Sequence, residues 1–265
     1  MFRTLLPPPE LRAYVRFFWT ARAPAGHAAP ERVIPDGCCE VIWQLADTFE
    51  RYESDRKSRQ PDAFLFGQLE RAICVAPLGV VDILGIRLTP AGAAGLWGLD
   101  VSELEPREYG LDDVLLPAHL PSLALLRETG SFTQRCSILT RWLHGRLRRT
   151  EAPAVQRAMA ALSLMHRGVM QPSEIADRIG CTRRSLERAF RSSTGLAPAA
   201  YLRLRRIDAC LPRLRSTTAR LATIAADAGF ADQAHFTREF HRIAGTSPSE
   251  YRREQGVREP LLTEP

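Results

Sequence analysis

Two stretches of this chain carry the same spacing of glycine, proline and tyrosine. Residues 180–201 read GCTRRSLERAFRSSTGLAPAAY and residues 229–251 read GFADQAHFTREFHRIAGTSPSEY. A separation of 50 residues is kept at five matched pairs: Leu186 and Phe236, Phe190 and Phe240, Gly195 and Gly245, Pro198 and Pro248, and Tyr201 and Tyr251. A register held over five positions indicates that one structural unit is present twice.

The first copy has the pattern of two short helices joined by a tight turn. Ser173 precedes apolar residues at 175, 176 and 179, which share one face of a short helix. Gly180 provides the backbone freedom that a turn between steeply crossed helices needs. Thr182 is a good N-cap for the next helix, whose apolar residues at 186, 189 and 190 face inward. The pattern predicts a helix-turn-helix unit.

The second copy follows this plan, with Ile224 before the turn at Gly229 and Phe236 after it. Ile175 and Ile224 are 49 residues apart, one fewer than the 50 that separate the later pairs. We therefore expect one extra residue in the turn of the second copy.

A spacer helix is predicted between the two units. Residues 198–211, PAAYLRLRRIDACL, open with Pro198 at a favoured first helical position and repeat apolar residues at helical spacing. A helix of this length spans roughly 20 Å. It suits two recognition helices that read successive major grooves about 34 Å apart. Pro212 falls where this helix would continue, so we expect a kink or an early end there.

Positive charge is concentrated in the half that carries the repeat. Residues 151–265 hold 18 arginines against 12 acidic residues, whereas residues 1–150 are balanced at 18 of each sign. This distribution is typical of a polyanion-binding module joined to a neutral domain. The alternative is a solvated arginine-rich surface, because the chain contains 35 arginines and a single lysine.

The C-terminal sequence, over roughly residues 155–253, resembles the AraC/XylS family of transcriptional regulators, and GFADQAHFTREFHRIAGTSPSEYR is close to that family's signature. The resemblance implies two recognition helices in the major groove of double-stranded DNA, RNA polymerase as a partner, and activation as the commoner mode. Arg can form two hydrogen bonds with guanine, Gln suits adenine, and Glu can accept a hydrogen bond from cytosine, so these side chains are suited to recognising bases. The residues implied to contact DNA are Thr182, Arg183, Arg184, Glu187, Arg188, Arg191, Gln233, His235, Thr237, Arg238 and Arg242.

The N-terminal half has a different texture, with short apolar runs broken by turns. ERVIPDGCCEVIWQL predicts two strands around a Pro-Asp-Gly turn, and RAICVAPLGVVDILGIRLTP predicts two more. A short helix is expected at AGAAGLWGL, and a longer one at residues 131–149, as a connector between domains or as a seam in a homodimer. We expect an α+β protein: a β-rich, barrel-like regulatory domain over residues 1–150, and an all-α DNA-binding domain over residues 151–265.

The N-terminal domain is expected to sense an unknown small molecule. VIPDGCCEVIW, followed by FGQ and RLTPAGAAGLWG, resembles the N-terminal domain of a less studied subset of the family. Trp19, Trp43, Phe64 and Phe66 are candidates for lining an apolar effector pocket. The competing interpretation is that these aromatic residues only fill the core.

Other functions find less support in the sequence. His27, His119 and His144 lie far apart, so we expect no metal or cofactor site, and no catalytic residues are assigned. Cys38 and Cys39 suggest an alternative function as a thiol sensor or as the nucleophile of a DNA-targeted enzyme, although no CxxC pair or nearby base supports it. No signal peptide or membrane span is evident, so we expect a cytoplasmic protein that is not an enzyme.

Overall fold

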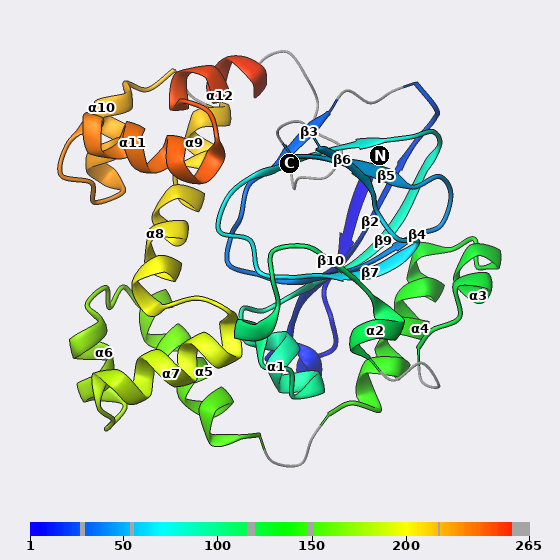
Figure 1. Cartoon of the computed structure of the whole chain (residues 1–265), viewed down its shortest axis with the longest axis horizontal. Helices are drawn as coiled ribbons and strands as arrows, with labels where there is room; N and C mark the ends of the chain where they lie inside the picture. Colours follow the sequence, from blue (N-terminus) through cyan, green and yellow to red (C-terminus); the bar gives the residue numbers. More distant parts are fainter. Residues whose placement is uncertain (27–29, 54–55, 116–119, 148–150, 217, 256–265) are drawn as a thin grey trace.

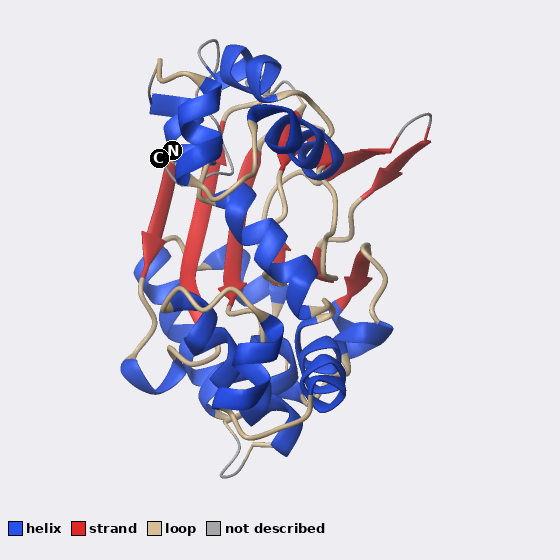
Figure 2. Ribbon diagram, turned by 90° about the vertical axis from the view of Figure 1, so that its left-hand side faces the viewer, coloured by secondary structure: helices blue, strands red, loops and turns tan. Residues whose placement is uncertain are grey.

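Strands fill the N-terminal half of the chain and helices fill the C-terminal half (Figure 1). The structure is a computed structural model that describes residues 1–26, 30–53, 56–115, 120–147, 151–216 and 218–255. The α+β class predicted from the sequence is confirmed. In Figure 2 the helices of the C-terminal half lie in front of the strands, so they cover one side of the β-rich part.

Six strands in the described part of the chain form one antiparallel sheet. In order across the sheet they are β1 (Phe2–Leu5), β2 (Val15–Ala23), β9 (Val81–Leu88), β4 (Glu40–Gln44), β7 (Ala63–Phe66) and β10 (Glu108–Gly110). Alternation along the strands gives the sheet two apolar faces. Trp19, Gly85 and Phe64 share one face, whereas Leu84, which precedes Gly85 in β9, shares the other face with its β4 partner Trp43.

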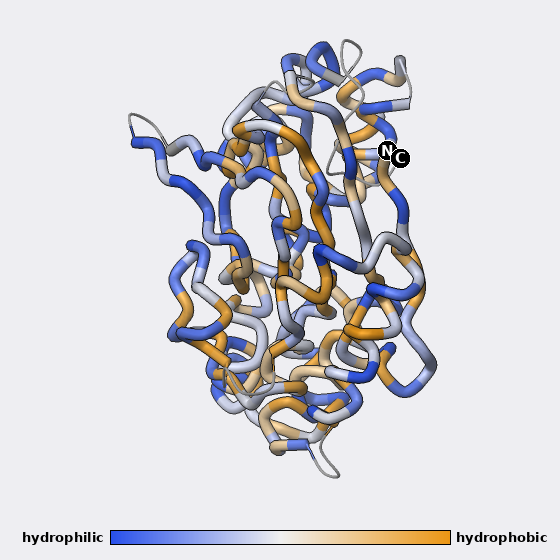
Figure 3. Tube along the Cα trace, turned by 90° about the vertical axis from the view of Figure 1, so that its right-hand side faces the viewer, coloured by the Kyte–Doolittle hydropathy of each residue, from blue (hydrophilic) through white to orange (hydrophobic). Residues whose placement is uncertain are grey.

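The same description contains a second antiparallel sheet of four strands, in the order β3 (Glu31–Val33), β8 (Ile73–Pro77), β5 (Phe49–Glu53) and β6 (Arg56–Arg59). The two sheets pack together through Trp19, Phe64, Phe49 and Val75. Strands were predicted on both sides of the Pro-Asp-Gly turn and both form, but β3 and β4 belong to different sheets. The β5–β6 hairpin projects from the body and is hydrophilic (Figure 3). Every side chain of the edge strand β6 is exposed, and three of its four residues are basic, which discourages pairing of the sheet edge with another chain.

Short helices cover the outer face of the six-stranded sheet. They are η1 (Pro9–Leu11), α1 (Gly92–Trp97), η2 (Val101–Glu103), α2 (Leu111–Val114), α3 (Leu123–Glu128) and α4 (Phe132–His144). Cys136, Leu139 and Leu143 of α4 are buried against this face of the sheet. The buried Arg135 of the same helix forms an ion pair with Asp82 of β9 at 2.9 Å. The apolar face of α4 is therefore used within the chain. Residues 148–149, the end of the helix predicted there, lie outside the described residues.

The C-terminal half is a series of helices with the predicted repeat. They are α5 (Pro153–His166), α6 (Pro172–Arg178), α7 (Arg183–Thr194), α8 (Pro198–Asp208), α9 (Leu211–Ser216), α10 (Leu221–Asp227), α11 (Gln233–Ala244) and α12 (Pro248–Gln255). The pairs α6–α7 and α10–α11 are the two helix-turn-helix units. Helix α7 begins three residues after Gly180, and α11 begins four residues after Gly229, which confirms the extra residue in the second turn.

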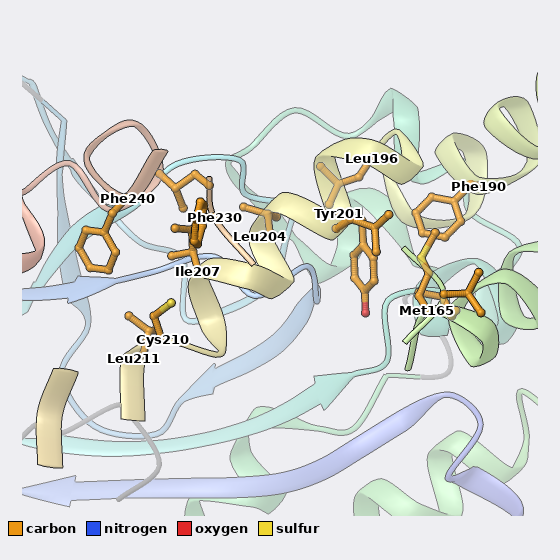
Figure 4. Packing of buried hydrophobic residues seen from close by; sticks show 14 of the residues in the cluster. Met165, Phe190, Leu196, Tyr201, Leu204, Ile207, Cys210, Leu211, Phe230 and Phe240 are labelled. Carbon is orange, nitrogen blue, oxygen red and sulfur yellow. The ribbon is translucent and has the colours of Figure 1, made fainter. Parts of the chain in front are cut away.

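The spacer helix stops early, as Pro212 predicted. Helix α8 ends at Asp208, and Pro212 is the second residue of α9. A proline ring clashes with the carbonyl four residues back, and here that carbonyl belongs to Asp208. One apolar cluster nevertheless runs across this break, from Met165 and Phe190 through Ile207 to Phe240 (Figure 4). The break bends the spacer while a shared core holds the two units together.

The loop between β3 and β4 connects the β-rich half to the spacer helix α8. Gly37 has a φ of +86°, and a Cβ atom on it would lie 2.7 Å from Cε2 of Tyr201 in α8. The adjacent Asp36 accepts hydrogen bonds from Arg87, Arg16 and the Cys38 amide. Burial opposes the charge on Asp36, but the two guanidinium groups hold its pKa below the usual value. The interactions of Asp36 with Arg16 and Arg87 hold the loop in place, and the loop in turn packs against Tyr201.

We expect Gly37→Ala to destabilise the protein by about 1–3 kcal/mol more than Gly26→Ala does, because overpacking against Tyr201 is added to backbone strain. Gly26 is the matched control: its φ is +80°, and nothing lies within 4 Å of its Cβ position. Backbone strain alone is expected to cost about 1–2 kcal/mol. The free energy of unfolding, measured in urea, checks this. Equal losses of unfolding free energy in the two variants would show that the contact of Gly37 with Tyr201 does not contribute to stability.

Candidate nucleic-acid interface

Helix α7 is a capped helix with one buried face. The Thr182 hydroxyl oxygen accepts a hydrogen bond from the Ser185 amide at 3.1 Å, as the sequence predicted for an N-cap. Gly195 ends the helix with a φ of +75°. The inward face consists of Leu186, Ala189 and Phe190, which are at most 3% exposed. The cap and the core contacts hold this helix in a single orientation.

The outward face of α7 is cationic. Arg183, Arg184, Glu187, Arg188 and Arg191 are all exposed. Arg183 pairs with Glu187 at 3.0 Å, one helical turn away. Among the residues that the structure describes, Arg184, Arg188 and Arg191 make no ion pair, so their guanidinium groups are available to a ligand.

Helix α11 is built in the same way but is capped by Asp232. Its carboxylate accepts a hydrogen bond from the His235 amide at 2.6 Å. The sequence interpretation did not single out Asp232, although an Asp just ahead of an apolar-periodic stretch is itself an N-cap signal. Phe236, Phe240 and Ile243 form the buried face and are 0% exposed. Asp232 lies 50 residues after Thr182, so the cap keeps its place at the start of the helix, and the extra residue lies between Gly229 and the cap.

The predicted DNA-contact residues on α11 differ in their exposure to solvent. Gln233, Arg238 and Arg242 are exposed, whereas His235 and Thr237 are half-buried. The His235 ring packs edge-on against Phe230, with 5.4 Å between ring centroids. One side of this imidazole is therefore committed to packing inside the second unit.

Glu239 is a residue of α11 that the sequence interpretation missed. Its carboxylate lies 2.9 Å from Nη2 of Arg242 and 3.9 Å from Nε of Arg203 in α8. The hydrogen bond from Arg242 is the main reason that the pKa of Glu239 is lowered. The spacing of three residues between Glu239 and Arg242 on one helix is the available sequence signal. This ionic contact links the second recognition helix to the spacer helix.

The four aromatic candidates for an effector pocket do not converge on one space. Trp19, Phe64 and Phe66 lie in the core between the two sheets, whereas Trp43 lies on the opposite face of the six-stranded sheet. There Trp43 packs against Trp142 of α4 with 5.8 Å between ring centroids. The reason is the strand periodicity of two: Trp43 and Phe64 are not in register, and Phe64 pairs instead with Ile42. Each of the four side chains is at most 7% exposed.

The cysteines near the Pro-Asp-Gly turn are poorly suited to thiol chemistry. Burial raises the pKa of Cys39 to about 12, and it raises the pKa of Cys38 well above its usual value. Because the thiolate is the nucleophile, a raised pKa disfavours nucleophilic chemistry at both thiols. Within the described ranges, no group of three His, Cys, Asp or Glu side chains is arranged to hold a metal ion. His27 and His119 lie outside these ranges.

None of the helices in the described part of the chain combines the length and the apolar character needed to cross a membrane.

Two family matches cover separate parts of the chain. Residues 175–254 match the family described as a helix-turn-helix domain, and residues 3–109 match a domain of unknown function, DUF6597. The first match contains both helix-turn-helix units except the first three residues of α6. The second contains all strands of the two sheets except the ends of β1 and β10.

Relatives and solved structures with AraC-type names resemble this chain. It is 27% identical over 169 residues to a protein described as an AraC-like transcription regulator of Streptomyces antibioticus, covering 62% of this chain and 54% of that protein. It is 39% identical over 79 residues to the HTH-type transcriptional activator RhaR of Yersinia pseudotuberculosis, covering 30% of this chain and 27% of the activator. The chain thus spans about half the length, or less, of these curated relatives.

Among solved structures, ToxT from Vibrio cholerae is 13% identical, with a TM-score of 0.47 over 95% of this chain and 97% of ToxT. The DNA-binding domain of AdpA, solved in complex with a target DNA, is 27% identical, with a TM-score of 0.35 over 40% of this chain and 96% of that domain. The two helix-turn-helix units, the family match over them and the named relatives together identify the C-terminal part of this chain as a helix-turn-helix domain of the AraC type.

Proposed function

We propose that this protein is a sequence-specific DNA-binding transcription regulator that works in the cytoplasm. The observation that carries the proposal is the pair of capped helices, α7 and α11, each with a buried apolar face and an exposed polar face. An α-helix fits the major groove of B-DNA, where each base pair presents a distinct pattern of donors and acceptors. Two such helices on one chain read two grooves without a second subunit.

Base reading is assigned to polar side chains in the first half of each helix. Arg184 and Arg188 suit guanine, Glu187 accepts from cytosine, and Gln233 suits adenine. His235 and Arg238 complete the second set. We assign phosphate contacts to Arg183, Arg191, Arg242 and the hydroxyl groups of Thr182 and Thr237. The Thr182 hydroxyl oxygen already accepts the Ser185 amide, so its own proton is the group available to donate to a phosphate.

The bend at Pro212 bears on how the two helices meet DNA. A continuous α8 through residue 212 would set one angle between the units, and the break after Asp208 sets another. Glu239 and the shared apolar cluster tie the second unit to α8 on the far side of the break. We infer an operator whose half-site spacing follows this bent geometry.

Regulation is assigned to the N-terminal domain. It contacts both helix-turn-helix units: Gly37 packs on Tyr201 near the first, and the Ala72 amide donates to the Ile243 carbonyl at the end of α11 in the second. We propose that this domain binds an apolar small-molecule effector near Trp19, Phe64 and Phe66, and that the bound state activates transcription through RNA polymerase. RhaR is named as an activator, which agrees with this mode. A homodimer is the second partnership that we propose.

We propose a domain boundary near residue 150, so a fragment of residues 151–265 is expected to fold and to bind DNA. Its main apolar cluster is supplied mostly from within the fragment, with Ala91 as an outside contributor. Removal of the β-rich half exposes Val155 of α5, which packs in the N-terminal core, and we expect some loss of stability. Circular dichroism and thermal denaturation measure the folding. An unfolded fragment would place the boundary elsewhere.

Replacing Arg188 or Arg238 with Ala is expected to weaken binding to the operator by about 1–3 kcal/mol and to relax preference at one or two base positions. Footprinting on the DNA flanking the protein's own gene locates the operator, and binding to single-base variants of it measures the preference. Arg56→Ala, on the hairpin β5–β6, is the control because it removes the same charge from an exposed strand outside both helix-turn-helix units.

The contrary result is an equal loss on every DNA sequence, which would assign these arginines to phosphates. Uniform protection of all DNA that disappears at moderate salt would contradict sequence-specific regulation itself, because such binding is purely electrostatic.

A further inference from the structure

A hollow of about 310 Å³ lies where the N-terminal domain meets the end of the second recognition helix. Arg71 and Ala72, just before β8, form one wall, and His241, Arg242 and Gly245 of α11 and its C-terminal turn form the other. Its size is at the small end of the range of about 300–1,000 Å³ that is usual for ligand sites. Neither domain forms this hollow alone.

Two hydrogen bonds hold the walls in place. The Ala72 amide donates to the Ile243 carbonyl at 2.7 Å, and Nη1 of Arg32 in β3 donates to the Ala244 carbonyl at 3.0 Å. Because Arg71 directly precedes Ala72, the first bond also sets the position of the Arg71 backbone beside α11. The hollow is therefore a built junction of two domains.

The charge of the lining is one-sided. Arg71, His241 and Arg242 bring guanidinium and imidazole groups together, and no carboxylate is among the five lining residues. Arg242 is paired with Glu239 at 2.9 Å. Within the described residues, the side chains of Arg71 and His241 form no ion pair or hydrogen bond. Arg71 is therefore the guanidinium group of the lining that lacks a carboxylate partner, and a bound anion supplies one.

The end of α11 does not cancel this charge. A helix C-terminus carries partial negative charge on its last carbonyl groups, which disfavours an anion. Here the Ile243 and Ala244 carbonyls already accept hydrogen bonds from Ala72 and Arg32, and the His241 carbonyl accepts one from the Gly245 amide at 2.8 Å. These oxygen atoms are occupied, and the Arg32 guanidinium beside them is itself paired with Glu254 at 3.9 Å.

We propose that this hollow is an anion-binding site that takes a single phosphate or carboxylate group between Arg71, His241 and Arg242. Guanidinium groups bind both kinds of oxyanion through charge-assisted hydrogen bonds. The anion has two sources: a phosphate of the DNA backbone next to α11, or a free phosphate or carboxylate compound. The first source rests on the proposed DNA-binding function, and the second does not.

A free anion at this position ties the N-terminal domain to a DNA-reading helix. It binds groups from both walls, so it stabilises the contact made by the Ala72 and Ile243 hydrogen bond. A DNA phosphate at the same position makes Arg71 a DNA contact supplied by the N-terminal domain. In both cases Arg71 is the residue to change, because it is exposed and lies outside the helix-turn-helix units.

The first arm of the test uses inorganic phosphate with the full-length protein. Thermal denaturation is followed in phosphate and in chloride at equal ionic strength and pH, for the unaltered protein, Arg71→Ala and the control Arg56→Ala. A ligand that binds only the folded state raises the Tm. We expect phosphate to raise the Tm of the unaltered protein and of Arg56→Ala, and to lose this effect in Arg71→Ala.

The second arm uses the operator. The dependence of the binding constant on salt has a slope of about −0.9 per neutralised phosphate in logarithmic form. If Arg71 contacts a DNA phosphate, Arg71→Ala makes the slope shallower by about 0.9, and Arg56→Ala leaves it unchanged. Circular dichroism of each variant confirms that the fold is retained.

The outcomes separate the sources and the hypotheses. A Tm effect that depends on Arg71 assigns the site to free anions, and a slope change that depends on Arg71 assigns it to DNA phosphate. If Arg71→Ala behaves as Arg56→Ala does in both arms, the anion site is wrong. If the unaltered protein binds no operator, the proposed function fails while the phosphate arm still decides the site.

Discussion

The packing of Tyr201 joins the two halves of this protein. Its ring lies against Gly37 of the β3–β4 loop on one side and contacts Phe190 of the first recognition helix, with 5.6 Å between ring centroids. The residue is 2% exposed, and burial raises the pKa of its phenol. One side chain thus belongs to the core of a helix-turn-helix unit and to the boundary between domains. A change in the loop at Gly37 therefore reaches a DNA-reading helix through a single contact.

The two helix-turn-helix units share a plan but stand in different surroundings. The first is pressed against the β-rich half near Gly195, whose Cβ position lies 3.2 Å from Cγ1 of Val101. The second meets that half through the hydrogen bonds to the end of α11 and through the ion pair of Arg32 with Glu254 in α12. Polar contacts of this kind exchange with water at little net cost, whereas apolar contacts do not. The second unit is consequently the one whose position a ligand at the domain junction can influence more easily.

Local signals in the sequence predicted much of the C-terminal half. Helix caps, turn glycines and the apolar period of α7 and α11 all depend on residues within a few positions of one another, so the pattern is visible without the fold. Pro212 is another local signal, because its clash with the Asp208 carbonyl needs only the chain itself. The residues of the expected effector pocket could not be grouped from such local signals. Trp43 was grouped with Trp19 and Phe64 by residue type, and strand register then placed it on the opposite face.

By itself, the sequence determined the duplicated helix-turn-helix units, their caps, the extra residue in the second turn and the early end of the spacer helix. The tertiary structure decided which surfaces meet: Gly37 with Tyr201, Ala72 with Ile243, and Arg71 with His241 and Arg242. Each of these pairs joins residues more than 160 positions apart. Contacts at such separation depend on how whole elements pack, and no periodicity or short motif encodes them.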